Sequence, residues 1–274
     1  NVSSVQSQNV RMSRVIYKKP HRRENNESDG PYNKMLKPEV SNWAIGITVS
    51  PRSKEQEYYT RTIDSVIRAG WKNPHLFIEP NTELRERHLE LPRINRKEKY
   101  GCWKNWFEGL KELVELYPDA DCYGMIQDDV VFCRGVRIFL EKVLWPNADV
   151  GLVSVFTPSH YTEDKPGFYR RNYGGKLWMA QTFFFPPDRA KNCINHTVCT
   201  GHDGDRNIDN IIGRWLYRIK KPPYYFSPSL SQHIGKTSTL WNNNLNQAKG
   251  RKSAKDFVGE DYDISHGMTD DSNI

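Results

Sequence analysis

A short apolar run that ends in two adjacent carboxylates constrains this chain more than any other feature. Residues 122–126 have the character of a buried strand, and Asp128 and Asp129 stand where that strand should end. Because side chains alternate along a strand, the two carboxylates cannot both point into a core. At least one is expected to face a crevice at the carboxyl end of the strand, where open α/β sheets bind ligands. Such a pair suits a hard divalent cation that holds phosphate oxygens, although an isolated Asp-Asp is more often an acidic turn.

The pattern around this pair predicts an α/β fold. A strand at residues 43–49, a helix at 55–69 and a strand at 75–79 follow one another, which predicts a right-handed βαβ unit with a parallel pair of strands. The glycine fingerprint of a dinucleotide site is absent from this unit, and this excludes a nicotinamide site there. Further helices are expected at 101–117, 135–144, 186–194 and 207–219, further strands at 150–156, 176–185 and 224–226, and a charged excursion at 84–100.

The ends of the chain differ from its middle. The 274 residues are enough for one large α/β domain, yet only 37% are hydrophobic and the mean hydropathy is -0.77. Residues 1–40 and 241–274 are polar and carry little apolar periodicity. We therefore expect a single domain at 41–240, with a flexible polar tail before it and a polar tail after it.

Charge and cysteine content indicate which partners and which cellular compartment the protein could have. The net charge is +7, with basic clusters at 18–23, 93–99 and 249–252. Such clusters are usually solvated, and a polyanionic partner such as nucleic acid is the alternative. The sequence shows neither a membrane span nor a signal peptide, which favours a cytoplasmic protein. Of the five cysteines, Cys193 and Cys199 could pair in an oxidising compartment, but free thiols are favoured.

Two further positions could act together with the acid pair. His233 lies in a tight segment before Gly235, where an imidazole could complete a mixed oxygen and nitrogen shell for Mn²⁺ or Mg²⁺. A histidine in such a place is more often a hydrogen-bonded structural residue. Asp209 stands in the first turn of an expected helix, whose dipole favours the ionised carboxylate. Simple stabilisation of the helix start explains Asp209 equally well.

At these residues the chain resembles a known group of proteins. The order of four motifs is similar to that of GT-A-fold nucleotide-sugar glycosyltransferases, most closely the family 2-like bacterial and viral enzymes. The motifs are Trp-x-x-Gly-x-Thr at 43–48, Gln-Asp-Asp at 127–129, Ile-Asp-x-x-Ile at 208–212 and Pro-Ser-Leu-x-Gln-His-Ile-Gly at 228–235. The last motif is also similar to the N-acetylglucosaminyltransferases that branch N-glycans. The resemblance implies a mixed, mainly parallel sheet flanked by helices.

The resemblance also implies roles for the donor side of a site. Asp129 would bind the metal directly, His233 would be the second protein ligand, and Asp128 would touch the ribose or sugar of the donor. The nucleotide would be met by Thr48, Val49, Ser50 and Arg52, with Glu79 near the base or ribose. Gln127 stands where the commoner motif has an acid. Since an amide cannot bind metal as an anion would, the site would depend on Asp129, phosphates and water.

On the acceptor side, the resemblance makes Asp209 the general base that deprotonates a hydroxyl group. Asp203 and Asp205 compete for this role, but they belong to a glycine-rich loop, whereas Ile208 and Ile211 anchor the helix of Asp209. Trp178, together with Met179 and Gln181, is a candidate for contact with the donor sugar or the acceptor, although a tryptophan on an apolar strand is more often part of a core.

These expectations lead to one predicted function and two alternative functions. We expect a metal-dependent, inverting glycosyltransferase that moves a sugar from a nucleotide diphosphate sugar, UDP-type favoured, to a glycan or protein hydroxyl. Adjacent acids on one strand do not suit a glycoside hydrolase, which places its carboxylates on either side of the scissile bond. The first rival is a glycosyltransferase acting on modified DNA bases, which the basic tails favour. The second is a non-catalytic module that binds nucleotide sugars or glycans.

Overall fold

The computed structural model describes residues 39–52, 58–171, 174–202, 206–235 and 253–267, all of which belong to one unit, Lys37–Ile274. Almost all of the expected N-terminal tail lies outside the described residues. So do the basic clusters at 18–23 and 249–252 and the loop acids Asp203 and Asp205.

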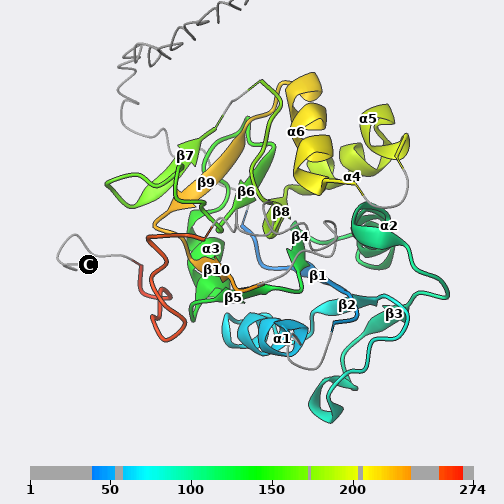
Figure 1. Ribbon diagram of the computed structural model, residues 1–274. Helices are drawn as coiled ribbons and strands as arrows, with labels where there is room; N and C mark the ends of the chain where they lie inside the picture. Colours follow the sequence, from blue (N-terminus) through cyan, green and yellow to red (C-terminus); the bar gives the residue numbers. More distant parts are fainter. Residues whose placement is uncertain (1–38, 53–57, 172–173, 203–205, 236–252, 268–274) are drawn as a thin grey trace, which may run out of the picture. The chain divides into compact units, whose positions relative to one another are not determined.

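A mixed eight-stranded sheet forms the centre of this unit (Figure 1), in the order β3-β2-β1-β4-β8-β6-β9-β7. The strands are β1 (Trp43–Val49), β2 (His75–Ile78), β3 (Arg93–Asn95), β4 (Cys122–Gln127), β6 (Leu152–Ser154), β7 (Gly167–Arg170), β8 (Thr182–Phe185) and β9 (Pro223–Ser227). Four of the pairings are parallel; β8 runs antiparallel to both of its neighbours, and β7 runs antiparallel to β9. The expected mainly parallel α/β sheet is confirmed.

Helices cover both faces of the sheet. They are α1 (Tyr58–Arg68), α2 (Gly101–Leu116), α3 (Val136–Val143), α4 (Pro187–Asn195), α5 (Thr197–Thr200) and α6 (Ile208–Ile219), with a 3-10 turn at Glu86–His88. Side chains of β4 alternate between two cores: Ile126 packs with α1 and α3, whereas Met125 packs with α2, α4 and α6. This alternation places the end of β4 between the two layers of helices.

The helix α2 lies very close to the sheet because of one glycine. A Cβ at Gly109 would stand 2.7 Å from the ring of Phe77 on β2, so a larger residue would push the helix away. The first turn of α2 is bound by Glu79, which follows β2. Both of its carboxylate oxygens accept from the N–H of Tyr100, and one accepts from Gly101 at 2.9 Å. A carboxylate in this position also suits the positive end of the helix dipole.

Several expected strands differ from those observed. The strand expected at 176–185 is confined to Thr182–Phe185, because Met179 adopts a left-handed conformation with φ 68° and its N–H binds Asp209 instead of a neighbouring strand. The strand expected at 150–156 is shorter, Leu152–Ser154. The short edge strands β3 and β7 were not expected, since neither has a fully buried residue that would mark it.

The described part of the expected C-terminal tail packs on the domain. Ala254 and Ile264 are 4% and 0% exposed. Gln232 exchanges two hydrogen bonds with the backbone of Ala254, and Arg134 forms a β-bridge with Asp263. Residues 253–267 therefore belong to the folded domain. In the part of the chain that the structure describes, no helix is both long and apolar enough to cross a membrane.

Candidate functional site

The carboxyl ends of β1 and β4 meet at one edge of the sheet. The two strands pair in parallel, with Thr48 opposite Gln127, so the segments that follow them leave the sheet side by side. Ser50 and Arg52 follow β1, and the two expected acids follow β4. This edge is the position where open α/β sheets bind ligands.

Asp128 joins these two segments. One carboxylate oxygen accepts from the backbone N–H of Ser50 at 2.8 Å, and the other accepts from Arg52 at 2.6 Å. Asp128 is only 5% exposed, so these bonds satisfy a carboxylate that would otherwise be costly to bury. Burial still raises the pKa of Asp128, against the opposing pull of Arg52 and with a contribution from the neighbouring Asp129.

Asp129 contacts His233 although the two residues are 104 positions apart. The cause is a second, two-stranded sheet, in which β5 (Val130–Phe132) pairs antiparallel with β10 (Ser231–His233) and places His233 opposite Val130. The imidazole Nε2 lies 3.1 Å from Asp129 Oδ2, and the N–H of Ile234 donates to the carbonyl of Asp129 at 2.8 Å. The pairing of the β5 and β10 backbones thus holds the side chains of Asp129 and His233 together at the edge of the main sheet.

Arg52 and His233 both lie against the Asp129 carboxylate. Burial by itself would raise its pKa, but the attraction of His233 and of Arg52 outweighs burial and lowers it. Arg52 Nη2 lies 3.4 Å from Asp129 Oδ2, and the two carboxylates raise the pKa of the guanidinium despite its burial. The lowered pKa favours the ionised form of Asp129, which is the form that binds a metal.

The carboxylate of Asp129 and the imidazole of His233 are suitable ligands for a divalent cation that has few other protein ligands. A Cβ at Gly235 would stand 2.6 Å from Asp129 Oδ2 and 2.9 Å from His233 Nε2, so only a glycine leaves this cradle open. Asp129 Oδ1 and His233 Nδ1 are buried and have no hydrogen-bond partner within the described structure. Among the described residues no group of three or more His, Cys, Asp or Glu forms a metal cluster, so water and a bound ligand would have to complete the shell.

Asp209 lies near the same edge through a chain of backbone contacts. The carbonyl of Gln181, just before β8, accepts from the N–H of Gln127 at 3.0 Å. Two residues earlier, the N–H of Met179 donates to Asp209 Oδ2 at 3.2 Å. The other oxygen of Asp209 accepts from the N–H of Asn210 at 2.8 Å. The start of α6 is thereby connected to the end of β4, with the carboxylate held in one orientation.

The other residues expected on the nucleotide side lie at the ends of β1 and β2. Val49 is fully buried, so only its backbone faces the edge, where its carbonyl accepts from the N–H of Glu79 at 2.9 Å. Thr48 lies one residue earlier and is half-buried. The carboxylate of Glu79 binds the start of α2, and the geometry therefore gives Glu79 a structural role. A contact between Glu79 and a nucleotide stays a prediction.

Around the expected sugar side, the structure places Trp178, a candidate from the sequence, near aromatic residues that the sequence analysis did not name. Trp178 is 40% exposed rather than part of the core, and its ring lies 5.3 Å from that of His160. The hydroxyl of Tyr225 donates to the carbonyl of Trp178 at 3.2 Å. Burial raises the pKa of Tyr225, and the nearby Tyr161 and Asp209 raise it further. In the sequence, the aromatic run at 224–226 was the only signal that included Tyr225, and it predicted a strand rather than a site.

Gln181 is a buried polar residue in the same region. It is 5% exposed, and its Oε1 has no hydrogen-bond partner in the described structure. A buried amide oxygen without a partner is costly, and this is expected where a ligand supplies the missing donor.

Comparison with known proteins supports the fold. No family model matches the chain, and no curated protein matches it. Among solved structures, it is similar to GalNAc-T7 with UDP, GalNAc and Mn²⁺, with a TM-score of 0.51 and 8% sequence identity. The match covers 71% of this chain and 44% of that chain, so the protein spans less than half the length of the one it resembles. The architecture is GT-A-like, as the sequence motifs implied.

Proposed function

We propose that the protein is a metal-dependent, inverting glycosyltransferase that transfers a sugar from a nucleotide diphosphate sugar, UDP-type favoured, to a hydroxyl acceptor. The observation that carries this proposal is the contact between Asp129 and His233 at the carboxyl edge of a GT-A-like sheet, 3.1 Å between Oδ2 and Nε2. The solved structure that it resembles contains UDP and Mn²⁺, which supports the choice of donor and metal.

Asp129 and His233 would hold the metal, and Arg52 would assist them. A divalent cation supplies positive charge that neutralises the diphosphate leaving group as the glycosidic bond breaks. The guanidinium of Arg52 already lies against Asp128 and Asp129, and such a planar donor can also bind phosphate oxygens. Asp128 holds both Arg52 and the N–H of Ser50, so its role is to position the segment after β1.

Asp209 would accept the proton of the attacking hydroxyl. The N–H groups of Met179 and Asn210 orient its carboxylate, and the dipole of α6 favours negative charge at this position. A carboxylate fixed in this way beside the end of β4 suits a single displacement, in which the base acts on the acceptor while the donor is held by the metal site.

Calorimetry of UDP binding with and without Mn²⁺ tests the proposal. We expect UDP to bind in the presence of Mn²⁺ and to bind at least about tenfold more weakly after treatment with EDTA, because the metal joins the protein to the diphosphate. Asp129→Asn should reduce the Mn²⁺-dependent affinity by a similar factor. As a control, Asp119→Asn removes an exposed carboxylate outside the site. Equal affinity with and without Mn²⁺ would contradict the metal-dependent mechanism.

A further inference from the structure

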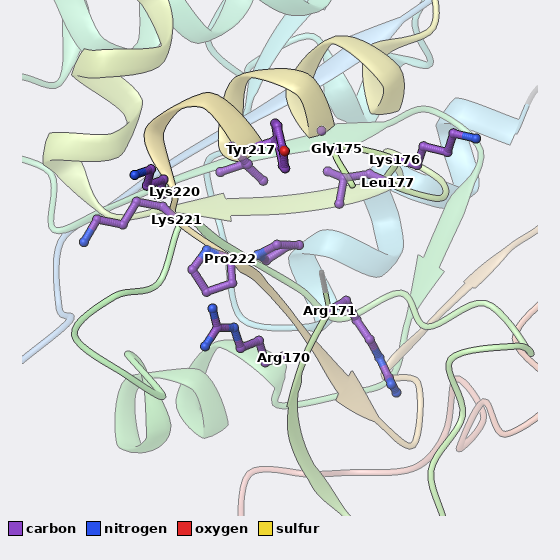
Figure 2. A pocket seen from close by; sticks show the side chains of 12 residues that line it. Arg170, Arg171, Gly175, Lys176, Leu177, Tyr217, Lys220, Lys221 and Pro222 are labelled. Atoms are coloured by element: carbon purple, nitrogen blue, oxygen red, sulfur yellow. The ribbon is translucent and has the colours of Figure 1, made fainter. Parts of the chain in front are cut away.

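Five basic side chains line a cavity near the far end of α6 (Figure 2), which has a volume of about 140 Å³. They are Arg170, Arg171, Lys176, Lys220 and Lys221. Lys220 and Lys221 follow the last turn of α6, whereas Asp209 stands in its first turn. At 1.5 Å per residue, Lys220 lies about 16 Å from Asp209 along the helix, so the basic end of the cavity is distant from the candidate base, whereas Leu177 and Gly213 line its opposite end.

The backbone around this cavity is tightly held. Gly213 of α6 packs on the backbone of Gly175, and a Cβ at Gly213 would overlap the carbonyl of Gly175. On the other side, the N–H of Gly151 donates to the carbonyl of Pro222 at 2.8 Å. The segments that carry the lysines and arginines are therefore fixed at their backbones around the cavity.

Nearby carboxylates do not balance this charge. Arg171 pairs with Glu163 at 2.6 Å, and Arg170 lies 3.9 Å from Asp149. None of the twelve described residues that line the cavity carries a carboxylate. Five positive and two negative charges leave an excess of three positive charges.

The end of α6 opposes this excess only weakly. Its last carbonyls carry partial negative charge, but the N–H groups of Lys220 and Lys221 donate to the carbonyls of Leu216 and Tyr217. This capping reduces the partial negative charge that the last carbonyls of α6 present to the cavity. A net positive potential therefore remains at the cavity.

We propose that this cavity binds a phosphoryl group. Figure 2 shows Arg170, Lys220 and Lys221 near Pro222, and their long side chains can turn toward one ligand there. A phosphoryl group presents three oxygens and up to two negative charges, which matches this set better than a single carboxylate. A volume of about 140 Å³ is enough for a phosphoryl group together with bound water.

Titration of the full chain with inorganic phosphate in EDTA tests this site without involving a donor or a metal. Amide NMR signals of Gly175 and Gly213 should shift on addition of phosphate, while that of Ser50 stays unchanged. The double variant Lys220→Gln/Lys221→Gln should bind phosphate at least about tenfold more weakly, because two charge-assisted donors are lost. The control Lys72→Gln/Lys111→Gln removes the same charge from exposed positions outside the cavity and should bind as the wild type does.

Two further titrations identify the form of the ligand. Binding of glucose 6-phosphate at least as tight as that of inorganic phosphate would assign the cavity to phosphate esters, and preference for inorganic phosphate would assign it to the free ion. Acetate should bind at least about tenfold more weakly than either. The proposal is wrong if the lysine variant binds phosphate like the wild type, if acetate competes equally, or if phosphate shifts only the signal of Ser50. These outcomes are independent of whether the protein transfers sugar.

Discussion

Gly235 is the residue whose missing side chain matters most to the pair of Asp129 and His233. A Cβ there would approach Asp129 Oδ2 to 2.6 Å and His233 Nε2 to 2.9 Å, closer than real Cβ contacts. To avoid this Cβ, either the Asp129 oxygen or the His233 nitrogen would have to move. The two atoms could then no longer face the same cation. The glycine thus affects the proposed metal site without being a ligand.

We expect Gly235→Ala to weaken Mn²⁺-dependent UDP binding by about 10- to 100-fold, the range typical of residues that orient metal ligands. The melt should remain cooperative, because the added methyl lies at an edge of the sheet. Gly201→Ala serves as the control, since its Cβ would meet only the carbonyl of Thr197, at 3.3 Å. Unchanged Mn²⁺ dependence in Gly235→Ala would show that the cradle does not hold the metal.

Asp209 should behave differently from the metal pair. A general base acts mainly in the transition state, so Asp209→Asn should lower the transfer rate by about 10²- to 10⁴-fold. Asparagine keeps an oxygen that can accept from the N–H of Met179, and UDP affinity with Mn²⁺ should therefore stay close to that of the wild type. The measurement pairs transfer rates with calorimetry. Full transfer by Asp209→Asn would remove Asp209 as the base and favour a retaining reaction.

At the scale of elements, short polar contacts position the strands that carry the site. Asp121, just before β4, accepts from the N–H groups of Ser41 and Asn42, just before β1, at 3.0 and 2.8 Å. Burial raises the pKa of Asp121, but the hydrogen bonds from Asn42 and Ser41 outweigh burial and lower it below 3.8. The starts of two neighbouring parallel strands are joined in this way.

The lowered pKa of Asp121 gives a pH-dependent contribution to stability. The ionised carboxylate stabilises the fold at pH values above 3.8, and this contribution is lost as the pH falls through the lower pKa of the folded state. We expect Asp121→Ala to reduce the free energy of unfolding by about 1 kcal/mol near pH 7, a small value because the group is only partly buried and is screened by solvent. Urea denaturation should show the difference shrinking as the pH falls below 3.8. Asp119→Ala, at an exposed neighbouring position, should show neither effect.

At the scale of the whole molecule, the C-terminal segment completes a core formed by much earlier residues. Ile264 is fully buried in the cluster that contains α1 and α3. Its N–H also donates to the carbonyl of Arg134 at 3.1 Å. The domain therefore extends beyond the region that the sequence motifs cover.

Replacing Ile264 by alanine should destabilise the protein by about 2–5 kcal/mol, because it leaves a cavity in a packed core. Asp261→Ala, in the same segment, should change stability by less than about 0.5 kcal/mol, since that side chain is 95% exposed. Chemical denaturation of both variants provides the comparison. Equal stability of the two would mean that residues 253–267 do not contribute to the core.

The sequence alone determined the elements whose signal is local. The bounds of β1 agree with the expected residues 43–49, and α2 and α6 begin and end within one residue of their expected positions. Each has a regular apolar pattern that depends only on near neighbours, together with a glycine, a proline or a polar residue at its ends. The class of fold follows from the order of such elements.

Only the tertiary structure decided the contacts between remote segments. Asp129 and His233 meet because β5 pairs with β10, and Met179 leaves the extended conformation because Asp209 binds its N–H. The edge strand β3 is paired on only one side, so its composition resembles that of a loop. In each case the deciding partner lies far along the chain. The free energy that local propensity contributes is smaller than that of such a contact. The pattern of near neighbours therefore does not predict the pairing or the backbone conformation of these segments.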